Sequence, residues 1–153
     1  NDMTRLGAAF KNSQDLRIKT FEIAGQTFRV RIPLTKEMEA IEERVKEVDQ
    51  AKFDERYEKL VAGFDKNIET AGVVFNDDDV IVDGRSTKDV VRIGLQFEAR
   101  VVEFIRLLVP QEGTLDDLTY EEIEAEWPLS VQIEIVGKIG DAIQPGYKDE
   151  RKN

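Results

Sequence analysis

Residues 19–32, KTFEIAGQTFRVRI, constrain the fold most strongly, because apolar and polar side chains alternate on both sides of Gly25-Gln26. Alternation with a period of two is typical of a half-buried β-strand, and a glycine permits a tight turn between two strands. We therefore predict a β-hairpin over residues 18–33 with a type II′ turn at Gly25-Gln26. Residues 1–17 precede it as an N-terminal arm.

This turn sets the register of the predicted hairpin and gives it one apolar face. The predicted cross-strand pairs are Ile23 with Phe28, Phe21 with Val30, and Glu22 with Arg29. The apolar face, which also includes Ile32, is expected to pack on the helices of the domain.

A long helix is predicted over residues 35–70, where apolar side chains recur at steps of three and four. Thr35 is expected to be its N-cap, because a threonine hydroxyl accepts a hydrogen bond from a free backbone N–H of the first turn. The apolar stripe has a gap between Val48 and Phe53. Two readings stay open here: an unbroken helix with a rotating stripe, or a bend near residues 49–52.

A second short hairpin is expected where two valine-rich runs, residues 73–75 and 80–82, flank an acidic turn. Helix start signals then predict a central helix over residues 86–109 and C-terminal helices over residues 119–143. Residues 144–153 are expected to form an exposed tail.

The segment 131–135 also alternates with a period of two, so a strand is the alternative to a helix there. Together the elements predict a mainly α fold with small β-hairpins, in the α+β class, with the N-terminal hairpin packed on three or four helices. A length of 153 residues fits a single domain.

The composition removes most catalytic and metal chemistry. The chain has no Cys and no His, which excludes disulfides, Cys/His zinc sites and Ser-His-Asp triads. The acidic turn over residues 76–84 lacks the ligand spacing of an EF-hand, and the glutamates of residues 121–126 are expected to spread around a short helix. No phosphate-binding glycine loop occurs. We therefore predict that the protein is not an enzyme and has no cofactor or metal.

Charge is distributed unevenly along a chain whose net charge is −10. Residues 1–34 contain six basic and three acidic side chains, whereas residues 110–127 contain seven acidic and no basic side chains. Segments of opposite sign favour head-to-tail self-association. The negative charge opposes nucleic-acid binding, and no stretch suits a membrane span or, in residues 1–14, a signal peptide. We expect a cytoplasmic protein without nucleic-acid or membrane partners.

Eight residues are candidates for self-association or partner binding. They combine the basic outward edge of the hairpin, the acidic segment and the single Trp, a residue type enriched at interface hot spots. They are Lys19, Arg29, Arg31, Asp116, Asp117, Glu121, Glu122 and Trp127. The alternatives are a solvated acidic surface and a Trp that belongs to the domain core.

The hairpin FEIAGQTFRVRIPLT followed at once by the acidic amphipathic segment KEMEAIEERV, together residues 21–45, resembles the tail assembly chaperones of long-tailed, siphovirus-type bacteriophages. The resemblance implies a non-enzymatic, mostly helical, self-associating protein in the cytoplasm of the bacterial host. It implies the tape measure protein as partner during tail morphogenesis, with the tail tube protein as a further one. It brings no catalytic residues.

Many proteins of that family are made in a short form and a frameshifted longer form. The ending Arg151-Lys152-Asn153 permits the slippery heptamer A-AAA-AAC in the gene, so a frameshifted product is one interpretation of this ending, and an ordinary solvated C-terminus is the alternative.

The alternative function is an acidic regulatory or inhibitor module of the DNA-mimic type, which would occupy a basic groove on a partner protein. The acidic residues of segment 110–127 support it, and the basic residues intermixed in residues 35–70 count against it. Charge and composition alone indicate only an interaction domain.

Overall fold

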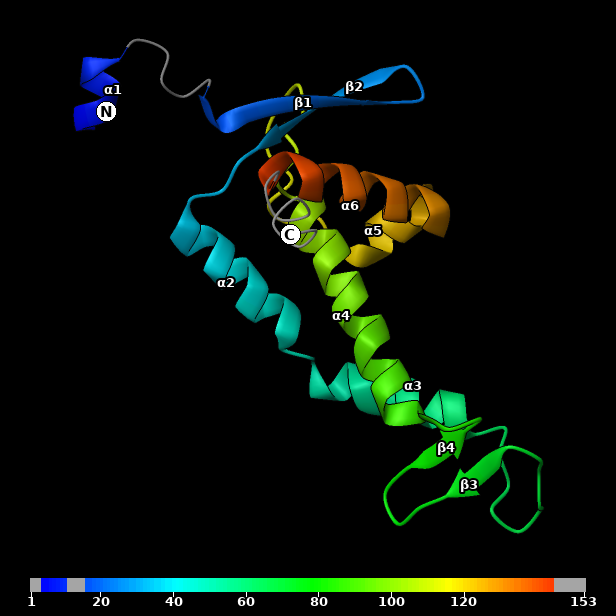
Figure 1. The fold of residues 1–153 in the computed structure, drawn as a ribbon. Coiled ribbons are helices and arrows are strands. Elements are labelled where there is room, and N and C mark those ends of the chain that lie inside the picture. Colours follow the sequence, from blue (N-terminus) through cyan, green and yellow to red (C-terminus); the bar gives the residue numbers. More distant parts are fainter. Residues whose placement is uncertain (1–3, 11–15, 145–153) are drawn as a thin grey trace, which may run out of the picture. The chain divides into compact units, whose positions relative to one another are not determined.

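The computed structural model describes residues 4–10 and 16–144 (Figure 1). Helices predominate and two small antiparallel sheets accompany them, which confirms the predicted α+β class. Contacts within the chain group it into two compact units. We call Asn1–Ile41 with Arg100–Asn153 the hairpin unit, and Glu42–Ala99 the ribbon unit. The single domain stays a prediction, because compact units also occur within one domain.

The helices are α1 (Arg5–Ala9), α2 (Thr35–Lys46), α3 (Gln50–Val61), α4 (Thr87–Ile105), α5 (Tyr120–Glu126) and α6 (Leu129–Ile143). The strands are β1 (Ile18–Ile23), β2 (Gln26–Arg31), β3 (Val73–Phe75), β4 (Val80–Val82) and β5 (Arg85–Ser86). None of the helices in the described ranges is both long and apolar enough to cross a membrane.

The N-terminal hairpin is confirmed, but its turn lies one residue earlier than predicted. Ala24 and Gly25 have φ values of 52° and 78°, and a type I′ turn requires positive φ at both central positions. Phe21 consequently pairs with Phe28, and their rings stack with centroids 5.4 Å apart. This aromatic contact favours the observed register although it places Ala24 in the left-handed region.

The predicted type II′ turn is therefore wrong, and so are the three pairs derived from it. The observed partners are Phe21 for Phe28, Lys19 for Val30, and Thr20 for Arg29. The pairing differs by two residues, so the apolar side chains keep their expected face, because faces alternate along a strand. Helix α6 packs against both strands, as Figure 1 shows, and Val30 is fully buried.

The chain that follows α4 pairs with the other edge of β2. Three backbone contacts make this pairing: Arg31 N–H to Leu107 C=O at 2.9 Å, Val109 N–H to Arg29 C=O at 2.8 Å, and an antiparallel bridge between Val30 and Leu108. The predicted helix over residues 86–109 is thus wrong at its end, since α4 ends at Ile105. Residues 107–109 are extended because β2 supplies their backbone partners.

The predicted helix over residues 35–70 is also wrong. Two helices, α2 and α3, are separated at residues 47–49, and α3 ends at Val61. The carboxylate of Asp49 accepts the N–H of Lys52 at 3.1 Å and caps α3. The break between the two helices lies in the gap of the apolar stripe. It is next to residues 49–52, where a bend was the alternative to an unbroken helix.

Predicted helix starts agree with the structure to within one residue. Ser86 Oγ accepts the N–H of Asp89 at 3.1 Å, as its resemblance to a capping box predicted. Thr35 is the first residue of α2 rather than its N-cap. Helix α6 includes residues 131–135, so the alternative of a strand there is wrong, and the exposed tail lies outside the described residues from 145 onwards.

Arg31 and Glu37 join β2 to the first turn of α2. Both terminal nitrogens of Arg31 donate to the carboxylate of Glu37, at 2.7 and 2.8 Å. This paired hydrogen bond is the main cause of a raised pKa for Arg31 and a lowered pKa for Glu37. The geometry is the bidentate one in which arginine binds carboxylate most strongly.

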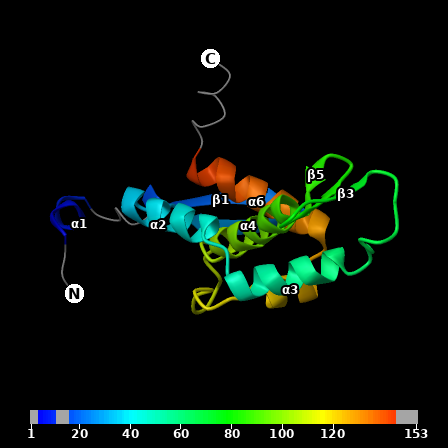
Figure 2. The ribbon, with the colours of Figure 1, turned by 90° about the horizontal axis from the view of Figure 1, so that it is seen from below.

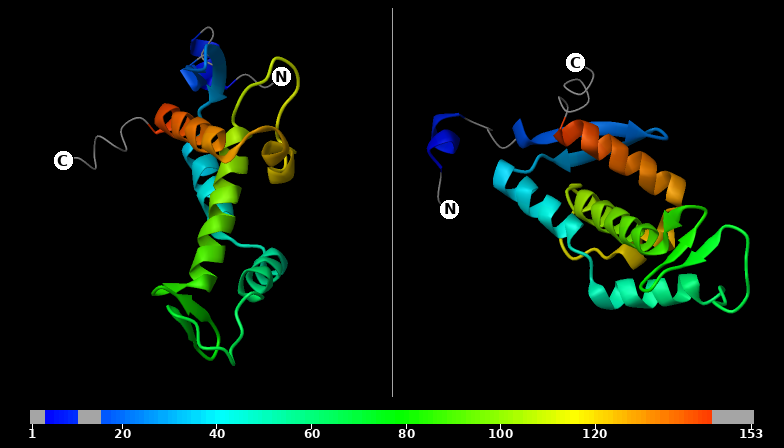
Figure 3. Two further views of the ribbon diagram at one scale, coloured as in Figure 1. Left: turned by 90° about the vertical axis from the view of Figure 1, so that its right-hand side faces the viewer. Right: turned by 60° about the horizontal axis from the view of Figure 1, so that its bottom comes forward.

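The second hairpin, β3 with β4, is confirmed, and β5 extends it into a three-stranded ribbon. A long loop connects α3 to β3 (Figure 2), and the ribbon leads through β5 directly into α4 (Figure 3). The short strands are held to α4 by one acidic side chain of the turn between β3 and β4.

That side chain is Asp79, whose carboxylate accepts five hydrogen bonds. Three come from the hydroxyls of Ser86, Thr87 at 2.8 Å and Tyr57 at 3.4 Å, and two come from the backbone N–H groups of Val80 at 2.8 Å and Lys88 at 3.2 Å. Burial by itself raises the pKa of Asp79, but these hydrogen bonds outweigh it and lower the pKa to about 2. Asp79 is thus an internal acceptor that joins the ribbon to the N-terminus of α4.

We expect Ala24→Gly to raise the free energy of unfolding by about 0.5–1 kcal/mol. The left-handed conformation costs alanine about 1–2 kcal/mol, and the flexibility of glycine in the unfolded chain returns part of that gain. Urea unfolding measures the difference. Gly25→Ala is the matched control of opposite sign: its added methyl group meets nothing within 4 Å, so its expected loss of about 1 kcal/mol comes from the backbone. Equal stabilities of the two variants would contradict the type I′ turn.

We expect Asp79→Asn to lower the free energy of unfolding by about 1–2 kcal/mol at neutral pH, because it weakens charge-assisted hydrogen bonds at a helix start. The folded-state pKa is below its ordinary value of 3.8, so the contribution of Asp79 is complete above about pH 4 and is lost as the pH falls towards 2. Urea unfolding from pH 7 to pH 2.5 should show a shallower acid slope for Asp79→Asn. The control Asp77→Asn, in the same turn but exposed, should keep the wild-type slope.

Candidate functional site

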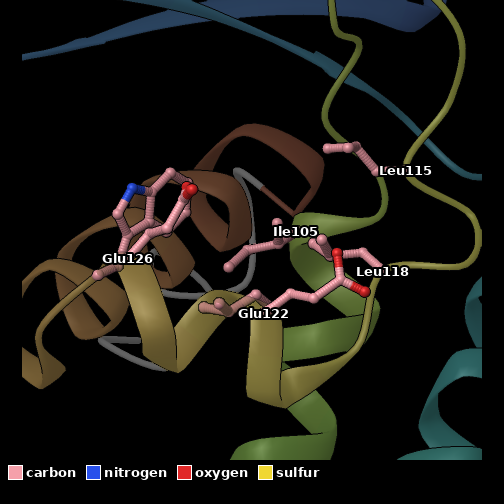
Figure 4. Close-up of a pocket in the computed structure, with 7 residues that line it drawn as sticks. Ile105, Leu115, Leu118, Glu122 and Glu126 are labelled. Atoms are coloured by element: carbon pink, nitrogen blue, oxygen red, sulfur yellow. The ribbon is translucent and has the colours of Figure 1, made fainter.

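A small apolar cavity lies in the hairpin unit where the end of α4, the segment 110–118 and α5 meet. Its volume is about 160 Å³. The residues that line it are Ile105, Leu115, Leu118, Glu122, Ile123, Glu126 and Trp127. The labelled side chains in Figure 4 come from all three segments. Glu122 and Glu126 are exposed, so the cavity reaches solvent beside two carboxylates.

Arg106 fixes the wall formed by the segment 110–118. Its Nε and Nη2 atoms donate to the carbonyl oxygen of Leu118, at 3.0 and 2.8 Å, and its Nη1 atom lies 3.9 Å from the carboxylate of Glu103. The end of this segment is therefore attached to the end of α4. This attachment places Leu118 beside Ile105 at the cavity.

Thr119 positions the carboxylate of Glu122. The hydroxyl oxygen of Thr119 accepts the N–H of Glu122 at 3.3 Å, and the hydroxyl group donates to Oε1 of the same residue at 3.3 Å. The predicted start of a helix at this pair is confirmed. A carboxylate in the first turn of α5 is also favoured by the helix dipole.

Gln132 of α6 holds both ends of α5. The hydroxyl of Tyr120 donates to Oε1 of Gln132 at 2.9 Å, and Nε2 of Gln132 donates to the carbonyl oxygen of Trp127 at 2.9 Å. Only 2% of Gln132 is exposed. A buried amide with both ends hydrogen-bonded fixes the backbone at Trp127, and thereby the wall that this residue contributes to the cavity.

The arrangement is suited to holding an apolar group. The two carboxylates sit beside aliphatic and aromatic side chains, and the lining contains no hydroxyl or amine. Among the described residues no group of three or more potential metal ligands occurs. An open apolar cavity with a few charged residues at its edge has the general form of a binding pocket.

Glu122 and Trp127 are the two predicted site residues that the structure brings to this cavity. Asp116, Asp117 and Glu121 are exposed and do not line it. The predicted acidic residues are therefore divided: Glu122 lines the cavity, and the other three lie on the exposed surface.

The predicted basic residues do not share one face of the hairpin. Lys19 pairs with Val30 and so lies on the apolar face, whereas Arg29 and Arg31 lie on the opposite face. Arg31 is also bound to Glu37, and the charge of Asp116 contributes to its raised pKa. Part of the charge expected to attract a second copy is thus balanced within the chain.

Sequence reasoning missed most of the cavity lining. Glu126 could have been found, because it follows Glu122 by one helical turn and such residues share a helix face. Leu115 and Leu118 carried no signal, since they lie in a segment without regular structure. Arg106 and Gln132 act through backbone carbonyls that only the fold brings near them.

A larger hollow of about 490 Å³ lies in the ribbon unit between α3 and the start of α4. The ammonium group of Lys88 lies 5.8 Å from the ring of Tyr57, and the guanidinium group of Arg92 lies 5.8 Å from the ring of Phe53. Arg92 also pairs with Asp89 at 2.6 Å. These cations already have partners within the unit, so we regard the hollow as part of the contact between α3 and α4.

Comparison with protein-family models, curated proteins and solved structures finds no match for this chain.

We expect Gln132→Leu to lower the free energy of unfolding by about 1–3 kcal/mol, because it removes the two buried hydrogen bonds that Gln132 makes with the Tyr120 hydroxyl and the Trp127 carbonyl. Since Trp127 is the single Trp, its fluorescence should change as well. Urea unfolding followed by fluorescence measures both. The exposed Gln111 provides the control Gln111→Leu, expected to change stability by less than about 0.5 kcal/mol. Equal effects of the two substitutions would contradict the bridging role.

Proposed function

We propose that the protein is a tail assembly chaperone of a long-tailed bacteriophage. In this proposal it is not an enzyme and it self-associates in the cytoplasm of the bacterial host. It binds the tape measure protein during tail morphogenesis, with the tail tube protein as a second partner. The observation that carries the proposal is the segment 21–45, whose hairpin and following amphipathic helix resemble that family and correspond to β1, β2 and α2.

The cavity at α5 gives separate support for a partner-binding function. Its lining combines aliphatic side chains, the single Trp and two exposed carboxylates, a set suited to holding a segment of another protein. The anionic surface around it opposes the phosphates of nucleic acids. A chaperone that keeps an apolar partner segment soluble needs both properties.

The exposed carboxylates outside the cavity favour one competing function, an acidic inhibitor module that occupies a basic groove. Asp116, Asp117 and Glu121 are free of the cavity lining and face solvent. Such a module would compete with DNA for its partner, whereas a tail assembly chaperone would not.

The test is co-expression with the protein encoded by the very long, helix-rich reading frame expected immediately downstream of this gene. We expect the two to co-elute in size-exclusion chromatography, and the long protein to stay soluble in the presence of this chain and to aggregate in its absence, because its apolar segments are covered. An excess of duplex DNA should leave the complex intact. Dissociation by DNA would favour the inhibitor module, and the absence of a complex would contradict the chaperone proposal.

A further inference from the structure

We propose that the cavity at α5 is the docking site for one amphipathic helix of a partner protein, which inserts a single large apolar side chain and places Lys or Arg side chains against Glu122 and Glu126. The inference rests on the proposed function only in taking the partner to be a protein. Three observations carry it: the volume of the cavity, the spacing of its carboxylates and the elements at its border.

The volume selects one side chain as the occupant. A cavity of about 160 Å³ is close to the ~150 Å³ apolar cavity that holds one benzene molecule, and it is smaller than the ~300–1,000 Å³ pockets that enclose metabolites and cofactors. A Leu, Met or Phe side chain matches this volume. The lining of Leu115, Leu118 and Ile123 offers such a side chain a largely apolar surface.

The carboxylates select a basic partner. Glu122 and Glu126 are separated by one turn of α5, and residues 110–127 include seven acidic and no basic side chains. Arg106, which follows the lining residue Ile105, already donates to the Leu118 carbonyl and pairs with Glu103. Charge complementarity therefore calls for cations from outside, on the same face of the partner helix as the apolar anchor.

The border of the cavity selects a helix rather than a strand. It is formed by α4, α5 and the irregular segment 110–118, and none of the lining residues belongs to a strand. An extended peptide would find no strand edge there to pair with its backbone groups, whereas a helix satisfies those groups internally. Binding of a helix in an apolar groove is the recognition mode that these elements permit.

The probes are three synthetic helical peptides of about 16 residues, a length at which helices can form. The first has a central Leu with Lys one turn before and one turn after it, the second has Ala in place of Leu, and the third has Glu in place of Lys. Trp127 lines the cavity and is the only Trp, so its emission reports binding directly. We expect the first peptide to shift the emission, the second to bind at least about tenfold more weakly, and the third not to bind.

Two pairs of substitutions test the carboxylates at equal net charge. The double substitution Glu122→Gln with Glu126→Gln should lower the affinity for the first peptide by about five- to tenfold at low salt, and by less at high salt. A Gln at position 122 still suits the capping box with Thr119, so α5 should remain folded. The control, Glu121→Gln with Glu124→Gln, removes two exposed glutamates of α5 outside the lining and should change the affinity by less than about twofold.

Leu118→Phe tests the cavity itself by filling it. We expect at least a tenfold loss of affinity for the Leu peptide with unchanged circular dichroism and thermal midpoint. The proposal is overturned if the Leu and Ala peptides bind equally, if emission does not change, or if the control pair loses as much as the Glu122 and Glu126 pair. It is also overturned if Leu118→Phe abolishes self-association in sedimentation, because the occupant would then be a second copy of the chain.

The same variant separates this inference from the proposed function. If the tape measure protein co-elutes with Leu118→Phe as it does with the wild type, the chaperone function stands and the cavity is not its site. If the Leu peptide binds but the tape measure protein does not, the docking site stands and the chaperone function fails.

Discussion

The hairpin unit depends on the pairing of β2 with residues 107–109. Strand β1 occupies one edge of β2 and this segment occupies the other, so β2 lies between two backbone partners and Val30 at its centre is fully buried. The contact joins parts of the chain that are far apart in sequence. It also ends α4 at Ile105, since the backbone of residues 107–109 cannot be bonded to β2 and continue a helix at once. The hydrogen bond of Val109 to β2 therefore fixes the start of the segment 110–118. This start helps to position the cavity wall that the segment forms.

Polar contacts fix the residues that form the walls of the cavity. Arg106 holds Leu118, Thr119 holds Glu122, and Gln132 holds the backbone of Trp127. Protein interiors are normally packed as densely as organic crystals, so walls free to move would close over a void of this size. Each of these contacts uses a backbone carbonyl or a carboxylate and cannot be satisfied equally well after such a collapse. Apolar surface that the fold keeps open in this way is surface that a partner can cover.

The sequence predicted local features well and long-range ones poorly. The apolar face of the hairpin and the helix starts at Ser86 and Thr119 follow from neighbouring residues, and the structure has them as expected. The register of the hairpin was wrong because stacking of Phe21 on Phe28 outweighs the turn preference of Ala24. The predicted end of the helix over residues 86–109 was wrong because the backbone of residues 107–109 is hydrogen-bonded to β2, a strand far away in the sequence. The cavity could not be predicted for the same reason, because its lining comes from α4, an irregular segment and α5. Only two of its lining residues, Glu122 and Trp127, were candidates from the sequence.

The distribution of charge limits which partners the acidic segment would attract. The attraction expected between a basic hairpin and an acidic segment of a second copy is reduced, because Arg31 is bound to Glu37 and also feels the charge of Asp116 in the same chain. The carboxylates of segment 110–127 have no comparable set of bases within that segment and present their charge to solvent. Exposed charges at the edge of an interface add little affinity, but they speed the approach of oppositely charged partners and repel those of like charge. Apolar contact in the cavity would therefore supply the affinity, and the acidic edge would decide which apolar segments are admitted, excluding acidic ones by repulsion.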